Sequence, residues 1–258
     1  MMSDIANTIL FEDVRRYDGE RCLCAMFAPE NERAALMALL SFNLELARIP
    51  ELVSEPLLGQ MRIQWWRQVV EDIYSSQPSS HPVARILEEP SVRDKLDRRL
   101  LLDILDARER DLTDELPEDL NALENYASST GGALNALMAQ ALGADDNFVS
   151  NVASPVGVAW ALTGLLRAMA FHRQQGRTYI LVEPEQVAVT AHAHIAKARA
   201  AVSWPSRKLM PVLLPALLAE RHLKKLQKTA YHSSPQDVQG PSSGTLFRLY
   251  VASVLRRF

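Results

Sequence analysis

Residues 58–73 read LGQMRIQWWRQVVEDI, and their large apolar side chains return every three or four positions. This spacing places side chains on one face of an α-helix. The stripe consists of Leu58, Met61, Trp65, Val69 and Ile73. We expect a helix that begins near Ser54-Glu55-Pro56 and buries this stripe. Trp65 is therefore predicted to pack in the core, whereas Trp66 lies about 100° away and is predicted to be a rim or interface residue.

The same helical periodicity recurs along the chain, and alternating strand patterns are essentially absent. Further helices are expected over residues 31–49, 96–112, 120–141, 158–169, 185–200, 206–230 and 242–258. Pro50 should stop or bend the first of these, and Gly143 is a good residue to follow the third. Residues 77–82 and 233–244 look like loops. We therefore predict one all-α domain over residues 1–258, with seven to nine helices.

Composition restricts the class of protein. The chain has 258 residues, 48% of them hydrophobic, which is enough for a sizeable core. Its net charge is -3, and the chain lacks the basic domain typical of nucleic-acid binding. The two cysteines, Cys22 and Cys24, are too few and too close for a disulfide framework, so we expect buried free thiols in a reducing compartment.

The sequence shows neither a secretory signal nor a membrane-spanning segment. The first residues show no basic segment followed by an apolar one, as a secretory signal would. No run of about 18 uncharged apolar residues is present, so we expect no membrane-spanning helix. We predict a cytoplasmic protein, and a peripheral contact with the inner face of the membrane stays open.

Three stretches resemble a known family. They are ALLSFNLELARIPELVSE (residues 38–55), LDARERDL (residues 105–112) with Tyr126 and Gly131-Gly132, and GVAWALTGLLR (residues 157–167) with GRTYI (residues 176–180). In this order and spacing they are similar to the squalene/phytoene synthase family over roughly residues 15–185. The resemblance implies the isoprenoid synthase fold, a helical bundle with a central cavity.

That family acts on prenyl diphosphates, whose charge is neutralised by Mg²⁺ bound to two Asp-x-x-x-Asp motifs. Spacing of four places both carboxylates of a motif on one helix face. Here the four positions hold Pro50, Ser54, Ala168 and His172, so every carboxylate is lost. Imidazole is a poor ligand for Mg²⁺. We therefore expect no cofactor, and Mg²⁺ only if the chain is an enzyme after all.

A closer resemblance covers most of the chain. It rests on Val53-Ser54-Glu55, MRIQWWRQVVEDIY (residues 61–74), LENYA (residues 123–127), LLRAMAFH (residues 165–172) and LYVASVLRRF (residues 249–258). These are similar to a branch of the family in which the Asp pairs are eroded. The branch includes the mitochondrial complex I assembly factor and its bacterial relatives.

This resemblance implies a non-catalytic protein that acts in respiratory complex I assembly by binding complex I subunits, assembly intermediates or a lipid-like ligand. Two alternatives stay open. One is an isoprenoid transferase acting on prenyl diphosphates, and the other is an isoprenoid carrier or sensor. The fold alone does not choose among them, since one fold hosts many functions.

Candidate ligand-binding residues match family positions near the lost motifs. Arg suits bidentate binding of diphosphate, but without metals nearby the candidate arginines and the tyrosine could instead pair with Glu45, Glu51 or Asp106. The carboxylate pair Asp106 and Asp111 stands beside Arg108 and Arg110, which is typical of a solvated helix face. His192 and His194 are predicted to lie on the surface. The candidate ligand-binding set is Arg48, Arg167, Arg177, Tyr179, Asp106 and Asp111.

A second set is proposed for a protein partner. Trp, Tyr and Arg are enriched at binding hot spots, and four such residues lie off the main stripe of residues 58–73 or beside it. This partner-binding set is Arg62, Trp66, Arg67 and Tyr74.

Overall fold

The computed structural model describes the chain apart from residues 1, 76–78, 114–116, 175–179 and 233–243, and leaves out the side chains of residues 2–9, 172 and 173. The described residues form helices and contain no strand. The longer helices are α1 Met2–Tyr17, α3 Glu30–Ala47, α5 Pro56–Tyr74, α8 Arg98–Glu109, α9 Leu120–Ala127, α10 Ala133–Ala141, α12 Ser154–Gln174, α13 Pro184–Ala201, α14 Met210–Lys228 and α15 Thr245–Leu255. Short helices connect them: α2 Gly19–Ala25, α4 Ile49–Leu52, α6 Pro82–Leu87, α7 Pro90–Arg93 and α11 Asp146–Phe148.

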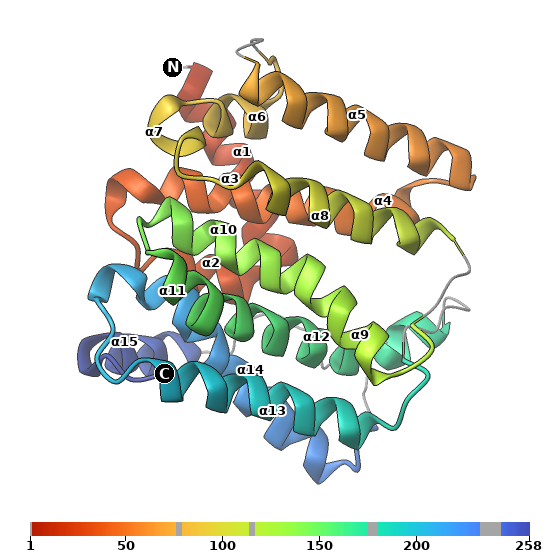
Figure 1. The fold of residues 1–258 in the computed structure, drawn as a ribbon, viewed down its shortest axis with the longest axis vertical. Helices are drawn as coiled ribbons and strands as arrows, with labels where there is room; N and C mark the ends of the chain where they lie inside the picture. The colour runs from red at the N-terminus through yellow and green to blue at the C-terminus, as the bar shows by residue number, and fades with distance from the viewer. Residues whose placement is uncertain (1, 76–78, 114–116, 175–179, 233–243) are drawn as a thin grey trace.

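The helices form layers. In Figure 1, α5, α8, α10, α12 and α13 follow one another down the long axis, and each neighbouring pair is in contact. Helix α3 packs against α1, α6 and α10, and α14 packs against α2 and α12. The all-α fold predicted from periodicity is confirmed. The predicted count of seven to nine helices is too low, because the sequence reading missed α1 and the short helices, two of which, α6 and α7, begin at a proline.

Helix α12 lies in the interior of the bundle and touches α10, α13 and α14. Among the described residues, the span 146–171 is the one helix long and apolar enough to cross a membrane, but 61% of its apolar window is buried within the protein. That burial is typical of a core helix in a globular domain. At Gly131 the helices approach closely: a Cβ there would lie 2.7 Å from the carbonyl oxygen of Gly157.

The prediction for the two tryptophans is wrong. Trp66 is 3% exposed, whereas Trp65 is 47% exposed together with Leu58 and Met61 of the predicted stripe. Helix α5 carries two apolar rows at helical spacing, and the one that faces α8 and α6 is the row of Ile63, Trp66, Val70 and Ile73. Periodicity alone could not distinguish the two rows. Of the predicted stripe, only Val69 and Ile73 at its C-terminal end are buried.

The cysteine prediction is confirmed for both thiols. Cys22 and Cys24 are free and buried in the core. Burial raises the pKa of the Cys22 thiol to about 11 and raises that of Cys24 well above its usual value. Neither thiol is therefore a nucleophile near neutral pH.

Candidate functional site

The two residues of the first lost motif, Pro50 and Ser54, do not lie on one continuous helix. Helix α3 ends at Ala47, and Pro50 lies buried in the single turn of α4, where proline is tolerated because its missing N–H would be unpaired anyway. Ser54 is exposed between α4 and α5. The sequence predicted that the helix would stop or bend at Pro50; α3 ends three residues earlier, at Ala47. As a result, residues 50 and 54 do not share one helix face.

The region of the second lost motif contains a buried ion cluster. Arg167 of α12 donates from Nη1 to Oε2 of Glu20 at 3.1 Å. His222 of α14 lies on the same carboxylate, with Nε2 2.8 Å from Oε2. The three side chains are at most 14% exposed. The cluster therefore ties α2, α12 and α14 together at the position where the sequence predicted anion binding.

The electrostatics of this cluster favour an ionised Glu20. Burial alone would raise the pKa of its carboxyl, but the hydrogen bond and charge of His222, together with Arg167, outweigh burial and hold the pKa below its usual value. Ala168 lies next to Arg167 on α12 and is partly buried. His172 belongs to the same helix, but its side chain lies outside the described residues.

Three of the other predicted ligand-binding residues, Arg48, Asp106 and Asp111, are described. The guanidinium of Arg48 lies 4.0 Å from the ring centroid of Tyr17, a cation–π contact, rather than against Glu45, Glu51 or Asp106. Asp106 is exposed and pairs with Arg67. Arg177 and Tyr179 lie outside the described residues.

Asp111 departs from its predicted place on a solvated face. Its side chain is 5% exposed. Tyr126 donates its hydroxyl to Asp111 at 2.9 Å, and Arg108 donates to it at 3.1 Å and to Asn43 at 3.3 Å. Asp111 lies in the short helix Arg110–Leu112, which follows α8, and α9 supplies Tyr126. This network joins α3, α8 and α9, and was not foreseen.

A pocket of about 240 Å³ opens between α1, α3, α4 and α5. Its lining combines two acidic and two basic side chains with an aromatic wall: Asp13, Ser41, Leu44, Glu45, Arg48, Ile49, Leu52, Arg62, Trp65 and Trp66. Burial, and then the charge of Asp13, raise the pKa of Glu45 to about 7, although Arg62 acts in the opposite direction. His81 lies 3.5 Å from Glu45, and burial lowers the pKa of its imidazole.

The predicted partner-binding residues do not form one surface. Trp66 is buried, with its ring 5.1 Å from Phe42 and 5.0 Å from His81 between centroids. Arg67 is held by Asp106 and by Glu109 at 2.8 Å. Tyr74 donates its hydroxyl to the carbonyl of Leu96 at 3.0 Å. Of the four, Arg62 is exposed, Arg67 and Tyr74 are partly buried, and Trp66 is buried rather than at a rim or interface.

A neighbouring surface carries exposed apolar side chains, three of which, Leu58, Met61 and Trp65, belong to the stripe that was predicted to be buried. It consists of Leu52, Leu57, Leu58, Met61 and Trp65, each between 46% and 62% exposed, and we name it the α4–α5 surface. Arg62 lies within it, and Trp65 also lines the pocket. The signal that could have found it is the presence of a second apolar row on the same helix.

The histidines on α13 behave differently from one another. His192 is exposed, as predicted. His194 is not on the surface: its Nε2 lies 2.9 Å from Oε1 of Glu124, and its side chain is 16% exposed. The contact joins α13 to α9, two helices whose pairing the sequence did not reveal.

The donor set does not fit Mg²⁺. Positions 50, 54 and 168 offer no carboxylate, and Glu20, the acidic group close to the second motif, is already bound by Arg167 and His222. No group of three or more potential metal-ligating side chains occurs among the residues whose side chains are described. We therefore derive no step through Mg²⁺, and the absence of a cofactor stays a prediction.

A scan of protein-family models matches residues 14–183 to the model "Squalene/phytoene synthase". The chain belongs to the squalene/phytoene synthase family. This family member is 31% identical over 267 residues to the human protein named NADH dehydrogenase (ubiquinone) complex I, assembly factor 6. The alignment covers 93% of this chain and 79% of the human protein. The bovine protein of the same name is 31% identical over 96% of this chain and 81% of its own length. Presqualene diphosphate synthase of Zymomonas mobilis is 26% identical over 60% of this chain and 54% of its own.

Solved structures support the fold of this family member. A dehydrosqualene synthase superposes with a TM-score of 0.85, 15% identity, and coverage of 99% of this chain and 97% of that one. Squalene synthase HpnC from Alicyclobacillus acidocaldarius superposes with a TM-score of 0.76, 13% identity, and coverage of 90% and 97%. At these identities the likeness confirms the isoprenoid synthase fold and nothing about chemistry.

Proposed function

We propose that this chain acts in the assembly of respiratory complex I as a binding protein and not as an enzyme. The observation that carries the proposal is the similarity to proteins named complex I assembly factor 6, which extends over more than nine-tenths of this chain. The match to presqualene diphosphate synthase, by contrast, covers 60% of it.

The chemistry of the former motifs supports a non-catalytic role. A family synthase needs carboxylates that bind metal and a cationic site that receives diphosphate. Here Pro50 and Ser54 are held in different segments, and Arg167 is neutralised by Glu20. A diphosphate entering at Arg167 would have to displace a buried carboxylate that is also bound by His222.

The α4–α5 surface is the proposed contact with a complex I subunit or assembly intermediate. Large exposed apolar side chains gathered on one face mark interaction sites. Trp65, Met61 and Arg62 are of the residue types enriched at protein interfaces. Compared with the partner-binding set predicted from the sequence, this surface contains the exposed Trp65 in place of the buried Trp66 and retains Arg62.

The test is deletion of the gene followed by complementation. Deletion should lower the amount of assembled complex I on native gels, together with NADH:quinone oxidoreductase activity. Wild-type protein should restore both, and Met61→Ser with Trp65→Ser should not, although both side chains are exposed and the variant should fold. Val189→Ser on α13 is the matched control, since Val189 is 63% exposed on another helix. Normal complex I in the deletion strain would refute the proposal.

The similarity to presqualene diphosphate synthase favours one further candidate, an isoprenoid transferase. The purified chain would then convert farnesyl or geranylgeranyl diphosphate to product in a Mg²⁺-dependent reaction. We expect no product. Binding of a prenyl diphosphate without turnover would favour the isoprenoid carrier or sensor instead.

We further propose that the protein works on the reducing, cytoplasmic side of the membrane. Its two free, buried thiols support this proposal.

A further inference from the structure

Helix α15 exposes apolar side chains to solvent along most of its length. Thr245 and Leu249 are buried against the bundle, whereas Phe247 and Tyr250 are 70% and 59% exposed. Leu246, Val251, Val254 and Leu255 are exposed as well. Monomeric proteins rarely leave so many large apolar groups together in water. This face therefore needs a partner.

The charged side chains of residues 244–258 all have one sign. Residues 244–258 contain Arg248, Arg256 and Arg257 and no acidic residue, although the whole chain has a net charge of -3. Arg256 lies over the ring of Trp204, at 5.1 Å, and Trp204 is itself 65% exposed. Glu220 of the neighbouring α14 is bound by Arg199 at 2.6 and 3.0 Å. The surface thus combines exposed aromatic groups with positive charge.

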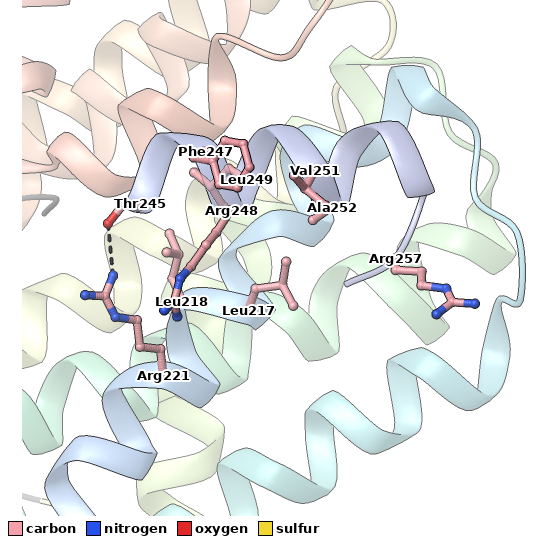
Figure 2. Close-up of a pocket in the computed structure, with 10 residues that line it drawn as sticks. All are labelled: Leu217, Leu218, Arg221, Thr245, Phe247, Arg248, Leu249, Val251, Ala252 and Arg257. Atoms are coloured by element: carbon pink, nitrogen blue, oxygen red, sulfur yellow. Dashed lines mark hydrogen bonds between the residues drawn. The ribbon is translucent and has the colours of Figure 1, made fainter. Parts of the chain in front are cut away.

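A cavity lies beneath the helix. Figure 2 shows it between α14 and α15, with Leu217 and Leu218 on one side and Leu249, Val251 and Ala252 on the other. Its volume is about 350 Å³, and Arg221, Arg248 and Arg257 also line it. Arg221 donates to the hydroxyl of Thr245 at 3.0 Å, which attaches the start of α15 to α14. An apolar cavity beside exposed guanidinium groups suits a molecule with a hydrocarbon tail and an anionic head.

We propose that α15, Trp204 and the cavity beneath the helix dock this protein onto a membrane that contains anionic phospholipid. Eleven residues give a helix of about 16 Å, too short for the hydrocarbon core of about 30 Å, so α15 lies in the plane of the interface. Phe247 and Tyr250 enter the acyl region, and the cavity accepts part of an acyl chain. Arg248 and Arg257 bind headgroup phosphates, and Trp204 lies at headgroup level.

Charge decides against the other occupants of an apolar face. In a second copy of the chain the same arginines would face each other, which opposes association. The membrane surface is anionic and matches them. Figure 1 places α5 along the top of the molecule and α15 at its lower left, so this contact does not compete with the α4–α5 surface. The inference does not depend on the proposed role in complex I assembly.

The test is co-sedimentation of the full chain with vesicles of phosphatidylcholine, alone or mixed with phosphatidylglycerol. The mixed vesicles should bind the protein, and salt should weaken the binding. Arg248→Gln with Arg257→Gln should weaken it about 25-fold, at about fivefold for each arginine. Phe247→Ser with Tyr250→Ser should abolish binding, whereas Val189→Ser, the matched control on α13, should leave it unchanged.

Four outcomes would overturn the proposal. One is failure of the wild-type chain to bind mixed vesicles, and a second is equal binding to both kinds of vesicle. The third is release by inorganic phosphate at constant ionic strength, which would assign the arginines to free phosphate. Light scattering separates a further case: a dimer lost in Phe247→Ser with Tyr250→Ser would assign the face to a second copy and refute the membrane. Retained circular dichroism in every variant shows that loss of binding is not loss of fold.

Discussion

Replacing Arg167 with alanine tests whether this residue serves the fold or a ligand. Arg167 is 9% exposed, and its Nη1 lies 3.1 Å from Oε2 of Glu20. The substitution therefore leaves a buried carboxylate with His222 as its remaining described partner. Removing one member of a buried ion pair costs about 3–5 kcal/mol. Because His222 still holds Glu20, we expect the lower end, about 3 kcal/mol. For a chain of this size that lowers the midpoint of thermal unfolding by about 6–12 °C.

The design includes a double variant. Arg167→Met with Glu20→Gln removes both charges and keeps the volumes, and such replacements are often neutral for stability. The double variant should therefore unfold at a higher temperature than Arg167→Ala. With the single variants Arg167→Met and Glu20→Gln it completes a double-mutant cycle, for which we expect a coupling free energy of about 1–3 kcal/mol. Urea unfolding monitored by circular dichroism gives these free energies directly.

The same cluster predicts a dependence on pH with a definite sign. Because the folded-state pKa of Glu20 is lowered below its usual value of 4.5, the stabilisation it gives is present above that value and is lost as the pH falls through the folded pKa. The difference between the wild type and Arg167→Ala should therefore shrink below about pH 4.5. The reasoning fails if Arg167→Ala costs less than about 1 kcal/mol and also abolishes pyrophosphate binding in calorimetry with EDTA. That pair of results would make Arg167 a ligand-binding residue.

Three further predictions follow from burial and close packing. Trp66→Ala should cost about 3–5 kcal/mol of unfolding free energy, whereas Trp65→Ala should cost less than about 1 kcal/mol; equal costs in chemical denaturation would contradict the assignment of the faces. Glu45 should titrate near pH 7 by NMR, and because its folded pKa is raised, Glu45→Gln should be nearly neutral at pH 4 and stabilising at pH 8. Gly131→Ala should lower the thermal midpoint, since its Cβ would meet the carbonyl oxygen of Gly157 and the Cβ of Ala161, both at 2.7 Å.

Local signals in the sequence predicted the helices well. Pro50 lies where α3 has already ended, and Gly143 follows α10 with φ of 74°, a conformation that glycine adopts without strain. Both features depend on a few neighbouring residues, so a pattern of the right residue types is sufficient. The two cysteines belong to the same class, since burial of free thiols is the ordinary outcome for a chain with no second pair.

The contents of the site were much less predictable. Glu20 lies 147 residues from Arg167 and 202 from His222, and nothing in the spacing of the sequence joins them. The side of α5 that is buried depends on Phe42 and His81, which come from other parts of the chain. Residue types alone identified Arg167 as a cation that needs an anion. They did not reveal that the anion is part of the protein.

This last point connects the site to the proposed function. A buried arginine without a counter-ion is unstable, so a protein that stops binding a buried anionic ligand must supply an anion of its own or lose the arginine. Glu20 supplies that anion here, with His222 on the same carboxylate. The charge of Arg167 is thus balanced without a ligand. Away from this site, α4, α5 and α15 expose large apolar side chains to solvent. We therefore expect this member of a family of synthases to act through its outer surfaces.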